Sequence, residues 1–394
     1  DFAKKFYEQM FDGCNFGDAV KSARASIYED YHLSNNTWGA YQCYGDPFYK
    51  LVKVSAASDK AAPEYLIAQE AEIDLNNLIS DLDTGSADVP YALRKVQMIA
   101  DAVKKADIQN SGTAENEAFI YAEIGDYENA IKKFEDLFKM ENAQFSVLAL
   151  EKYCNLSTRV CVSGYLSSAV QGKTNWAEQL NTIIGRLDYL LLISPTAERY
   201  CLLGSAYKRR AIITSGVQRK ASLKAAAFYY YMATQKTTQP SVYAVTNWFQ
   251  MEAVIRLNDK QPWNLKETVT VSKNLFVPDA DTAMKKSYEL ISREEAIETL
   301  ARLQATINKP LQNMDYWQLV SGANIALCQL VMSRKADKEA WGSLLETYKR
   351  VWKKSGSVAK RKTELEHLEA LYSVLSHKSV LKDNLIKLEQ QLEK

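Results

Sequence analysis

The chain has 394 residues, and its 49 lysines and arginines are balanced by 48 aspartates and glutamates. A net charge near zero provides no overall field that would favour nucleic acid or an anionic membrane surface. Only 15 glycines and 8 prolines occur, which disfavours a turn-rich all-β protein and favours helices joined by short loops.

The first 31 residues predict two short helices. Phe2, Phe6 and Met10 fall on one face of the first helix. Gly13 suits a left-handed helix stop, and Asn15 can cap the second helix.

A short aromatic strand is expected next, from Trp38 to Tyr44. Pro47 ends it, because proline cannot donate to a β-ladder. A lone strand leaves its backbone groups unpaired, and the later sequence offers few partner strands. Since the chain also opens on Asp1 rather than on Met, we expect a fragment or cleaved product whose partner strands lie upstream.

Three stretches near the start are distinctive: Phe6-Tyr7, FGDAVKSAR (Phe16 to Arg24) and NTWGAYQCYGDP (Asn36 to Pro47). With them, residues 1–53 resemble the C-terminal end of a CHAT domain, a caspase-like peptidase module that is often fused to tetratricopeptide repeats. In that family the catalytic His and Cys lie upstream of this segment and have no matching positions here. The resemblance implies a parent cysteine endopeptidase, regulated and of bacterial type, in defence or stress signalling, and a piece without its own catalytic dyad.

Residues 54–63 are small and polar and end on Pro63, which predicts a linker. Helical patterns then continue with little interruption over residues 64–394. The predicted fold is therefore mainly α: a tetratricopeptide-like α-solenoid, preceded by a short α/β piece from the end of a caspase-like domain.

The clearest repeat is AENEAFIYAEIGDYENAIKKFEDLF (Ala114 to Phe138). Ala118 and Tyr121 lie on its first helix, Gly125 makes a tight turn, and Ala130 faces inward on the second helix. This spacing resembles the tetratricopeptide pattern, in which small residues let two helices approach closely.

A second repeat unit begins near Tyr200. Gly204 and Tyr207 have the first-helix spacing, and Ala226 and Tyr230 have the second-helix spacing. The extra sequence between these positions predicts that both helices are longer than usual.

Residues 316–331 and 338–352 predict a possible third repeat pair. Helices without the repeat signature are expected at 63–82, 90–106, 144–169, 175–193, 242–257 and 283–307. Residues 360–394 predict a charged helical hairpin whose polar outer face would cap the array. Residues 259–279 contain two prolines and an alternating Thr-Val run, which predict an inserted long loop or small hairpin.

The sequence contains no convincing catalytic, metal or cofactor motif. A pairing of His32 with Cys14 or Cys43 is conceivable, but packed, unreactive thiols are the preferred interpretation. His367 and His377 lack metal ligands at a suitable spacing, so surface or capping roles are expected. Gly172-Lys173-Thr174 resembles only the tail of a phosphate-binding loop, and no strand precedes it.

The remaining cysteines, Cys154, Cys161, Cys201 and Cys328, form no C-x-x-C pair. All six cysteines predict free thiols in a reducing compartment, hence a cytoplasmic location. No apolar run is long enough for a membrane span.

The basic cluster Lys208-Arg209-Arg210 and the lysines and arginines at 353–362 raise the possibility of nucleic-acid binding. Solvated surface is the preferred interpretation, because a binding groove needs basic and aromatic residues together on one face. The run Phe228 to Met232 is expected to be mostly core. A steep salt dependence of binding would favour a nucleic-acid-linked regulator instead.

Aromatic side chains on a concave helical surface make good anchors for a peptide. The predicted partner-binding residues are Tyr121, Tyr207, Tyr230, Tyr231 and Trp248. The function predicted is that of a C-terminal fragment of a CHAT-type cysteine peptidase. Its repeats bind a regulatory protein or peptide, and its first residues pair with the upstream half of the caspase-like domain. The alternative is a non-enzymatic tetratricopeptide-like scaffold for protein–protein interaction.

Overall fold

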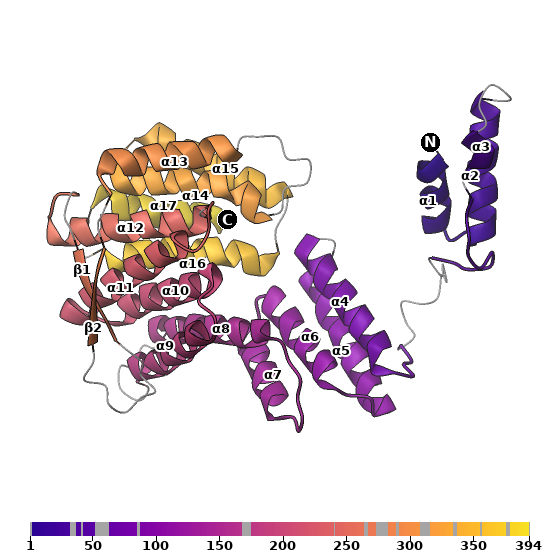
Figure 1. The fold of residues 1–394 in the computed structure, drawn as a ribbon, viewed down its shortest axis with the longest axis horizontal. Helices are drawn as coiled ribbons and strands as arrows, with labels where there is room; N and C mark the ends of the chain where they lie inside the picture. Colours follow the sequence, from indigo (N-terminus) through magenta and orange to yellow (C-terminus); the bar gives the residue numbers. More distant parts are fainter. Residues whose placement is uncertain are drawn as a thin grey trace. The chain divides into compact units, whose positions relative to one another are not determined.

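The computed structural model describes residues 2–31, 37–40, 42–51, 63–84, 87–167, 175–239, 241–263, 267–272, 283–288, 291–307, 316–333, 337–354, 357–375 and 379–393. The chain divides into two compact units, Asp1–Pro63 and Glu64–Lys394, each of which is described by itself. Both are built mainly from α-helices (Figure 1). The linker expected at 54–63 lies outside the described residues, apart from Pro63.

The first unit contains α1 (Phe2–Phe11), α2 (Phe16–Tyr31) and the single turn α3 (Thr37–Ala40). The predicted stop after α1 is confirmed, because Gly13 adopts a φ of 85°. The predicted cap of α2 is also confirmed: the Asn15 side-chain oxygen accepts a hydrogen bond from the Asp18 N–H at 2.8 Å.

The strand expected at Trp38 to Tyr44 is wrong: α3 covers its beginning, and residues 42–44 have no regular structure. Instead the chain turns after residue 46 and closes onto the start of α2, where the Gly17 N–H donates to the Pro47 carbonyl at 2.9 Å. In the described part of this unit, the one extended pairing is an isolated bridge between Asn15 and Lys50. A strand without neighbours cannot satisfy its backbone groups, so this segment satisfies them through turns.

The second unit begins with nine helices that pack in succession (Figure 1). Their bounds are α4 (Ala68–Thr84), α5 (Val89–Ala106), α6 (Ser111–Glu123), α7 (Tyr127–Lys139), α8 (Val147–Ser167), α9 (Trp176–Ile193), α10 (Ala197–Ile213), α11 (Gly216–Thr234) and α12 (Val242–Asp259). The helices predicted in this stretch are confirmed to within a few residues at their ends.

The pair α6 and α7 shows why the repeat pattern folds as it does. Ala118 and Ala130 are fully buried between the two helices, where a larger side chain would push them apart. Gly125 adopts a φ of 83° in the connecting turn, and the Asp126 side chain caps α7 by accepting from the Asn129 N–H.

The pair α10 and α11 confirms the second repeat and its long helices, which have 17 and 19 residues. The ring of Tyr230 lies directly against Gly204, so closely that a β-carbon at Gly204 would be 2.9 Å from Tyr230 Cγ. Tyr207 stacks on Tyr229 with ring centroids 5.4 Å apart. The run Phe228 to Met232 is mostly core, as predicted.

The insertion after α12 forms an antiparallel hairpin of β1 (Glu267–Ser272) and β2 (Ala283–Tyr288). This confirms the prediction of a small hairpin, but the hairpin extends beyond residue 279. The helix expected to start at Ala283 is wrong in its first turns, because those residues pair with the Thr-Val run, with Lys286 opposite Val269. The helix α13 covers Arg293–Ile307.

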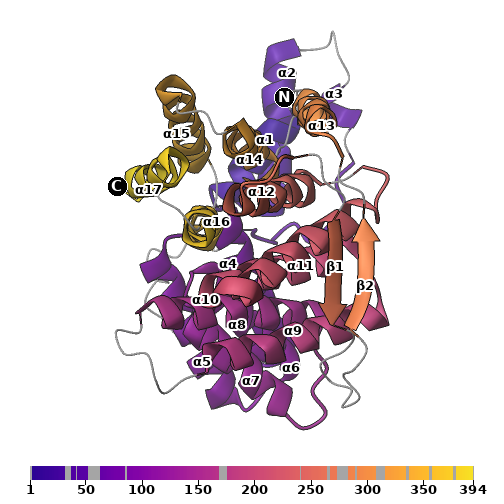
Figure 2. The ribbon, with the colours of Figure 1, turned by 90° about the vertical axis from the view of Figure 1, so that its left-hand side faces the viewer.

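The C-terminal helices are α14 (Tyr316–Ser333), α15 (Lys338–Lys354), α16 (Val358–Val374) and α17 (Val380–Leu392). The predicted helical hairpin is confirmed, but its role as a polar outer cap is wrong for α16. This helix packs against α10 (Figure 2) and also against α6, both far earlier in the sequence. Glu364, Leu368 and Leu371 are buried there, and Lys360 pairs with Asp83 of α4. Because both sides of α16 are covered, it lies inside the unit rather than at its end.

The contact between Gly204 and Tyr230 predicts a difference between two glycine-to-alanine variants. Gly204→Ala should lower the free energy of unfolding by roughly 1–3 kcal/mol, because the new methyl group collides with the Tyr230 ring. Gly342→Ala, on an open face of α15, should raise it by about 0.5–1 kcal/mol through better helix propensity. Urea denaturation followed by circular dichroism measures both. Equal effects of the same sign would contradict close packing at Gly204.

Candidate functional site

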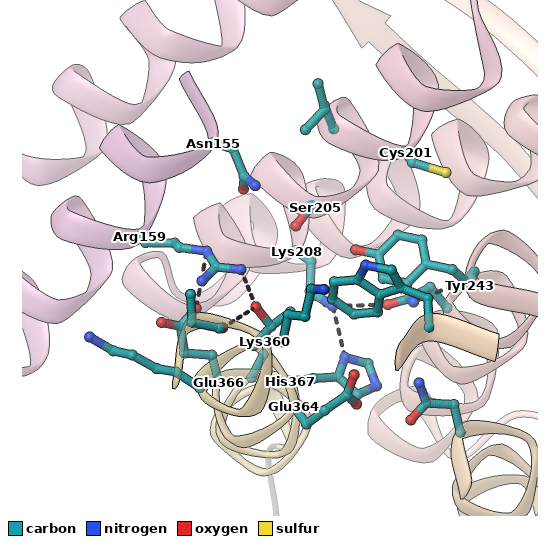
Figure 3. Close-up of a pocket in the computed structure, with 18 of the residues that line it drawn as sticks. Asn155, Arg159, Cys201, Ser205, Lys208, Tyr243, Lys360, Glu364, Glu366 and His367 are labelled. Carbon is teal, nitrogen blue, oxygen red and sulfur yellow. Dashed lines mark hydrogen bonds and ion pairs between the residues drawn. The ribbon is translucent and has the colours of Figure 1, made fainter. Parts of the chain in front are cut away.

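The second unit encloses a cleft with a volume of about 1940 Å³. Residues of α6, α7, α8, α10, α12, α13, α14 and α16 line it. Figure 3 shows the part where α16 faces α8 and α10. Charged side chains from all three helices meet there, so the polar chemistry of the cleft is concentrated at this point.

Lys208 and Arg209, expected on the solvated surface, lie instead in the cleft, and that expectation is wrong for both. Lys208 is 5% exposed and the Arg209 side chain is 11% exposed. Ser205 lies three residues before Lys208 and Ile212 lies four residues after it, and both line the same cleft. This spacing places the three residues on one face of α10.

Two guanidinium groups face the same carboxylate. Arg159 Nε on α8 is 3.4 Å from Glu366 Oε2 on α16 (Figure 3), and Arg209 Nη2 is 3.8 Å from that same oxygen. Arg159 also donates to Tyr127 Oη and to Thr363 Oγ1, each at 2.7 Å. The arginine on α8 is therefore fixed from both sides of the cleft.

Arg209 is held by α8 and by its own helix. Its Nη1 donates to Ser205 Oγ at 2.8 Å and to Asn155 Oδ1 and Thr158 Oγ1 at 3.1 Å. Burial and the neighbouring Arg159 lower the pKa of Arg209. Positive charge is thus crowded at this position.

Lys208 continues the polar contacts toward α12. Its Nζ is 2.9 Å from Asn247 Oδ1 and 2.9 Å from His367 Nδ1, and His367 Nε2 is 2.8 Å from Gln250 Oε1. An ammonium donates and an amide oxygen accepts, so His367 carries its proton on Nε2. Burial and Lys208 hold the pKa of His367 well below its usual value. The expectation of a surface or capping role for His367 is therefore wrong, while His377 lies outside the described residues.

Glu364 is a buried carboxyl on the inner side of α16 and is 4% exposed. Burial raises its pKa to about 7, and hydrogen bonding from Asn324 and the charge of Lys208 oppose the rise. Burial likewise lowers the pKa of Lys208 to about 7, with Arg209 acting in the same direction. At neutral pH this pair is poised between a charged and a neutral state.

The five predicted partner-binding aromatics do not line this cleft. Tyr207, Tyr230 and Trp248 are buried, because they fill the space between α10, α11 and α12, and the expectation that they are exposed anchors is wrong. Tyr121 packs half-buried near α7, and Tyr231 packs half-buried against Trp248 with ring centroids 5.0 Å apart. Whether either binds a partner stays a prediction.

Other aromatic residues line the cleft instead, namely Tyr127, Trp176, Tyr243 and Trp317. Tyr243 is 38% exposed and Trp317 is 43% exposed. Sequence reasoning missed Tyr243 and Trp317 as binding residues because they lie outside the two clearer repeats.

A sequence signal for the charged residues did exist. Glu364 precedes Leu368 and Leu371 by four and seven residues, so it occupies the apolar stripe of its helix. A charged residue on such a stripe is buried when the helix packs, and it then needs a partner.

The conceivable pairing of His32 with Cys14 or Cys43 is not tested, because His32 lies outside the described residues. Cys14 and Cys43 are half-buried free thiols, and Cys14 Sγ donates to Gln9 Oε1. The segment Gly172-Lys173-Thr174 also lies outside the described residues. Within the described ranges, no three His, Cys, Asp or Glu side chains gather in a way that could hold a metal ion.

Comparison with known proteins identifies one family. Residues 126–252 match the family TPR-S, Tetratricopeptide Repeats-Sensor, a stretch that begins at the cap of α7 and ends within α12. No curated protein sequence matches the chain. Among the helices in the described part of the chain, none has both the length and the apolar character needed to cross a membrane. The helical region is therefore tetratricopeptide-like, and the match includes Arg159, Lys208 and Arg209.

The raised pKa of Glu364 predicts a pH-dependent stability. Between about pH 4.5 and 7 the folded chain keeps a proton that the unfolded chain releases, so the free energy of unfolding falls as the pH rises. The glutamine side chain of Glu364→Gln is neutral at every pH. Between pH 5 and pH 8 the free energy of unfolding of this variant should therefore fall by on the order of 2–3 kcal/mol less than that of the wild type. Urea denaturation at pH 5 and pH 8 measures the difference. The exposed Glu294→Gln on α13 is the control and should retain the wild-type dependence; an unchanged dependence in Glu364→Gln would contradict the assignment.

Proposed function

We propose that the helical repeats recognise a protein partner, a segment of which enters the cleft. The observation that carries this proposal is the pair of exposed aromatic side chains, Tyr243 and Trp317, on the wall of a cleft of about 1940 Å³. Tryptophan and tyrosine are the residues that most often dominate binding energy at protein interfaces. A tetratricopeptide-like region is a scaffold for such contacts, and the match to a family described as a sensor supports a recognition role.

We further propose that the recognition region regulates a caspase-like cysteine endopeptidase in defence or stress signalling. The support is the resemblance of residues 1–53 to the end of a CHAT domain, carried above all by NTWGAYQCYGDP. The free thiols of all six cysteines support a cytoplasmic location. The second candidate is a non-enzymatic scaffold, which the absence of a strand among the described residues of the first unit favours. The encoded sequence upstream of Asp1 separates the two: a His and a Cys, each after a hydrophobic strand, support the peptidase.

Replacing an aromatic residue of the cleft should weaken partner binding. Trp317→Ala should reduce affinity about tenfold or more, because the side chain is an exposed anchor in the cleft. The full chain, immobilised, is used to capture partners from a cell extract, and captured proteins are quantified by mass spectrometry.

Tyr189→Ala is the matched control, since Tyr189 is 60% exposed on α9 and does not line the cleft. A partner that binds in the cleft is retained by Tyr189→Ala and lost by Trp317→Ala. Partners that respond equally to both variants, or to neither, would show that recognition takes place elsewhere.

A further inference from the structure

A second kind of ligand, beyond the partner protein, is indicated by the charges at the floor of the cleft. Whichever way Lys208 and Glu364 titrate, the guanidiniums of Arg159 and Arg209 share the single carboxylate of Glu366. Their distances to Glu366 Oε2, 3.4 Å and 3.8 Å, exceed those of charge-assisted hydrogen bonds. Buried positive charge is thus only partly neutralised, which costs free energy in the absence of a further anion.

Donor groups remain available on both arginines. Arg159 Nε is buried without a hydrogen-bond acceptor among the described residues, and the Arg159 side chain is 8% exposed. The three hydrogen bonds of Arg209 to described residues all use Nη1, so its Nε and Nη2 groups are not used in them. A guanidinium has five N–H donors in a fixed fork, which suits a planar or tetrahedral oxyanion.

One further cation, Lys362, lies beside this pair. Lys362 Nζ is 4.2 Å from the ring centroid of Tyr127, and the Arg159 guanidinium is 5.2 Å from the same centroid. Within the described part of the chain, Lys362 forms no ion pair. Glu198 and Glu369 also line the cleft, and burial raises the pKa of each. Among the described residues, the carboxylate that forms ion pairs with Arg159 and Arg209 is that of Glu366.

The chemistry favours phosphate over carboxylate. A carboxylate ligand would offer only what Glu366 already supplies: two oxygens and one negative charge. A phosphate group has more acceptor oxygens and a charge of about −1.5 to −2 at neutral pH, so it can satisfy both arginines together. The burial of the arginines limits the ligand to a small group or molecule, and Tyr243 and Trp317, which line the same cleft, offer aromatic faces to a ring attached to it.

We propose that the floor of the cleft binds a small phosphorylated molecule, whose phosphate replaces the Glu366 carboxylate between Arg159 and Arg209. Glu366, whose side chain is 25% exposed, then turns toward solvent. In the free protein Glu366 is an internal competitor for the site. The two proposals rest on different residues, the arginines here and the exposed aromatic side chains there, so each can fail alone.

Isothermal titration calorimetry of the full chain with inorganic phosphate, pyrophosphate and ADP, at constant ionic strength, tests the proposal. The wild type should bind at least one of them saturably. Arg209→Lys keeps the positive charge but removes the planar guanidinium group and its fixed set of N–H donors, so it should weaken binding of the phosphate probe about tenfold or more. Glu366→Gln removes the competitor, and should strengthen binding about threefold or more. Arg186→Lys, on an exposed arginine of α9 that does not line the cleft, should have no effect.

Thermal melting of each variant shows whether it is folded. If Arg209→Lys does not fold, the comparison of Glu366→Gln with the wild type still decides the proposal. The proposal is overturned if neither the wild type nor Glu366→Gln binds any of the three probes saturably below about 10 mM. It is also overturned if Glu366→Gln weakens binding, or if Arg186→Lys changes it as much as Arg209→Lys does. If a phosphoserine peptide binds and none of the three small probes does, the proposal of a small phosphorylated molecule is overturned and the ligand is a phosphorylated protein.

Discussion

The return of α16 onto α8 and α10 is the contact on which the shape of the second unit depends. In a repeat array each unit touches only its neighbours, and the chain stays open. Here Arg159 and Thr363 are hydrogen-bonded although 204 residues separate them in sequence. The Ser357 hydroxyl adds a second link by donating to Glu123 on α6 at 3.1 Å. These contacts place α16 against the inner side of the earlier repeats and give the array an enclosed cleft.

The charged contacts between α16 and the arginines determine how this helix is oriented more than they add to the free energy of unfolding. Buried ion pairs gain little over apolar packing, because the desolvation of both charges offsets their attraction, whereas removal of one partner is strongly destabilising. The apolar stripe of α16, with Leu368 and Leu371 fully buried, accounts for the attraction between the helices. The arginines and Glu366 then favour the register and orientation of α16 in which Glu366 faces both guanidinium groups.

Features that depend on neighbouring residues could be predicted from the sequence, whereas contacts between residues far apart in the sequence could not. Ala118, Gly125 and Ala130 act on neighbouring turns, so the helix pair α6 and α7 could be located from spacing alone. The charged cleft could not, because Arg159, Arg209 and Glu366 lie on three helices whose approach no local pattern encodes. The same limit explains the two strand errors. Residues 38–44 are rich in aromatic side chains, but no strand pairs with the described residues of this stretch in the part of the chain that the structure describes. Residues 283–288 have a helical pattern, and no local pattern encodes their pairing with β1.

The cleft also links recognition to the position of α16. Arg159 and Arg209 belong to one side of the cleft and Glu366 to the other, so any anion that reaches the arginines exchanges with a contact that holds the sides together. A ligand that replaces this contact binds more tightly to a cleft in which α16 has relaxed, and by linkage it shifts the population toward that state. Trp317 on α14 and Tyr243 on α12 line the same cleft, so a partner there meets a surface whose width depends on α16. A charge pair that looks structural is therefore suited to couple two binding events in one helical array.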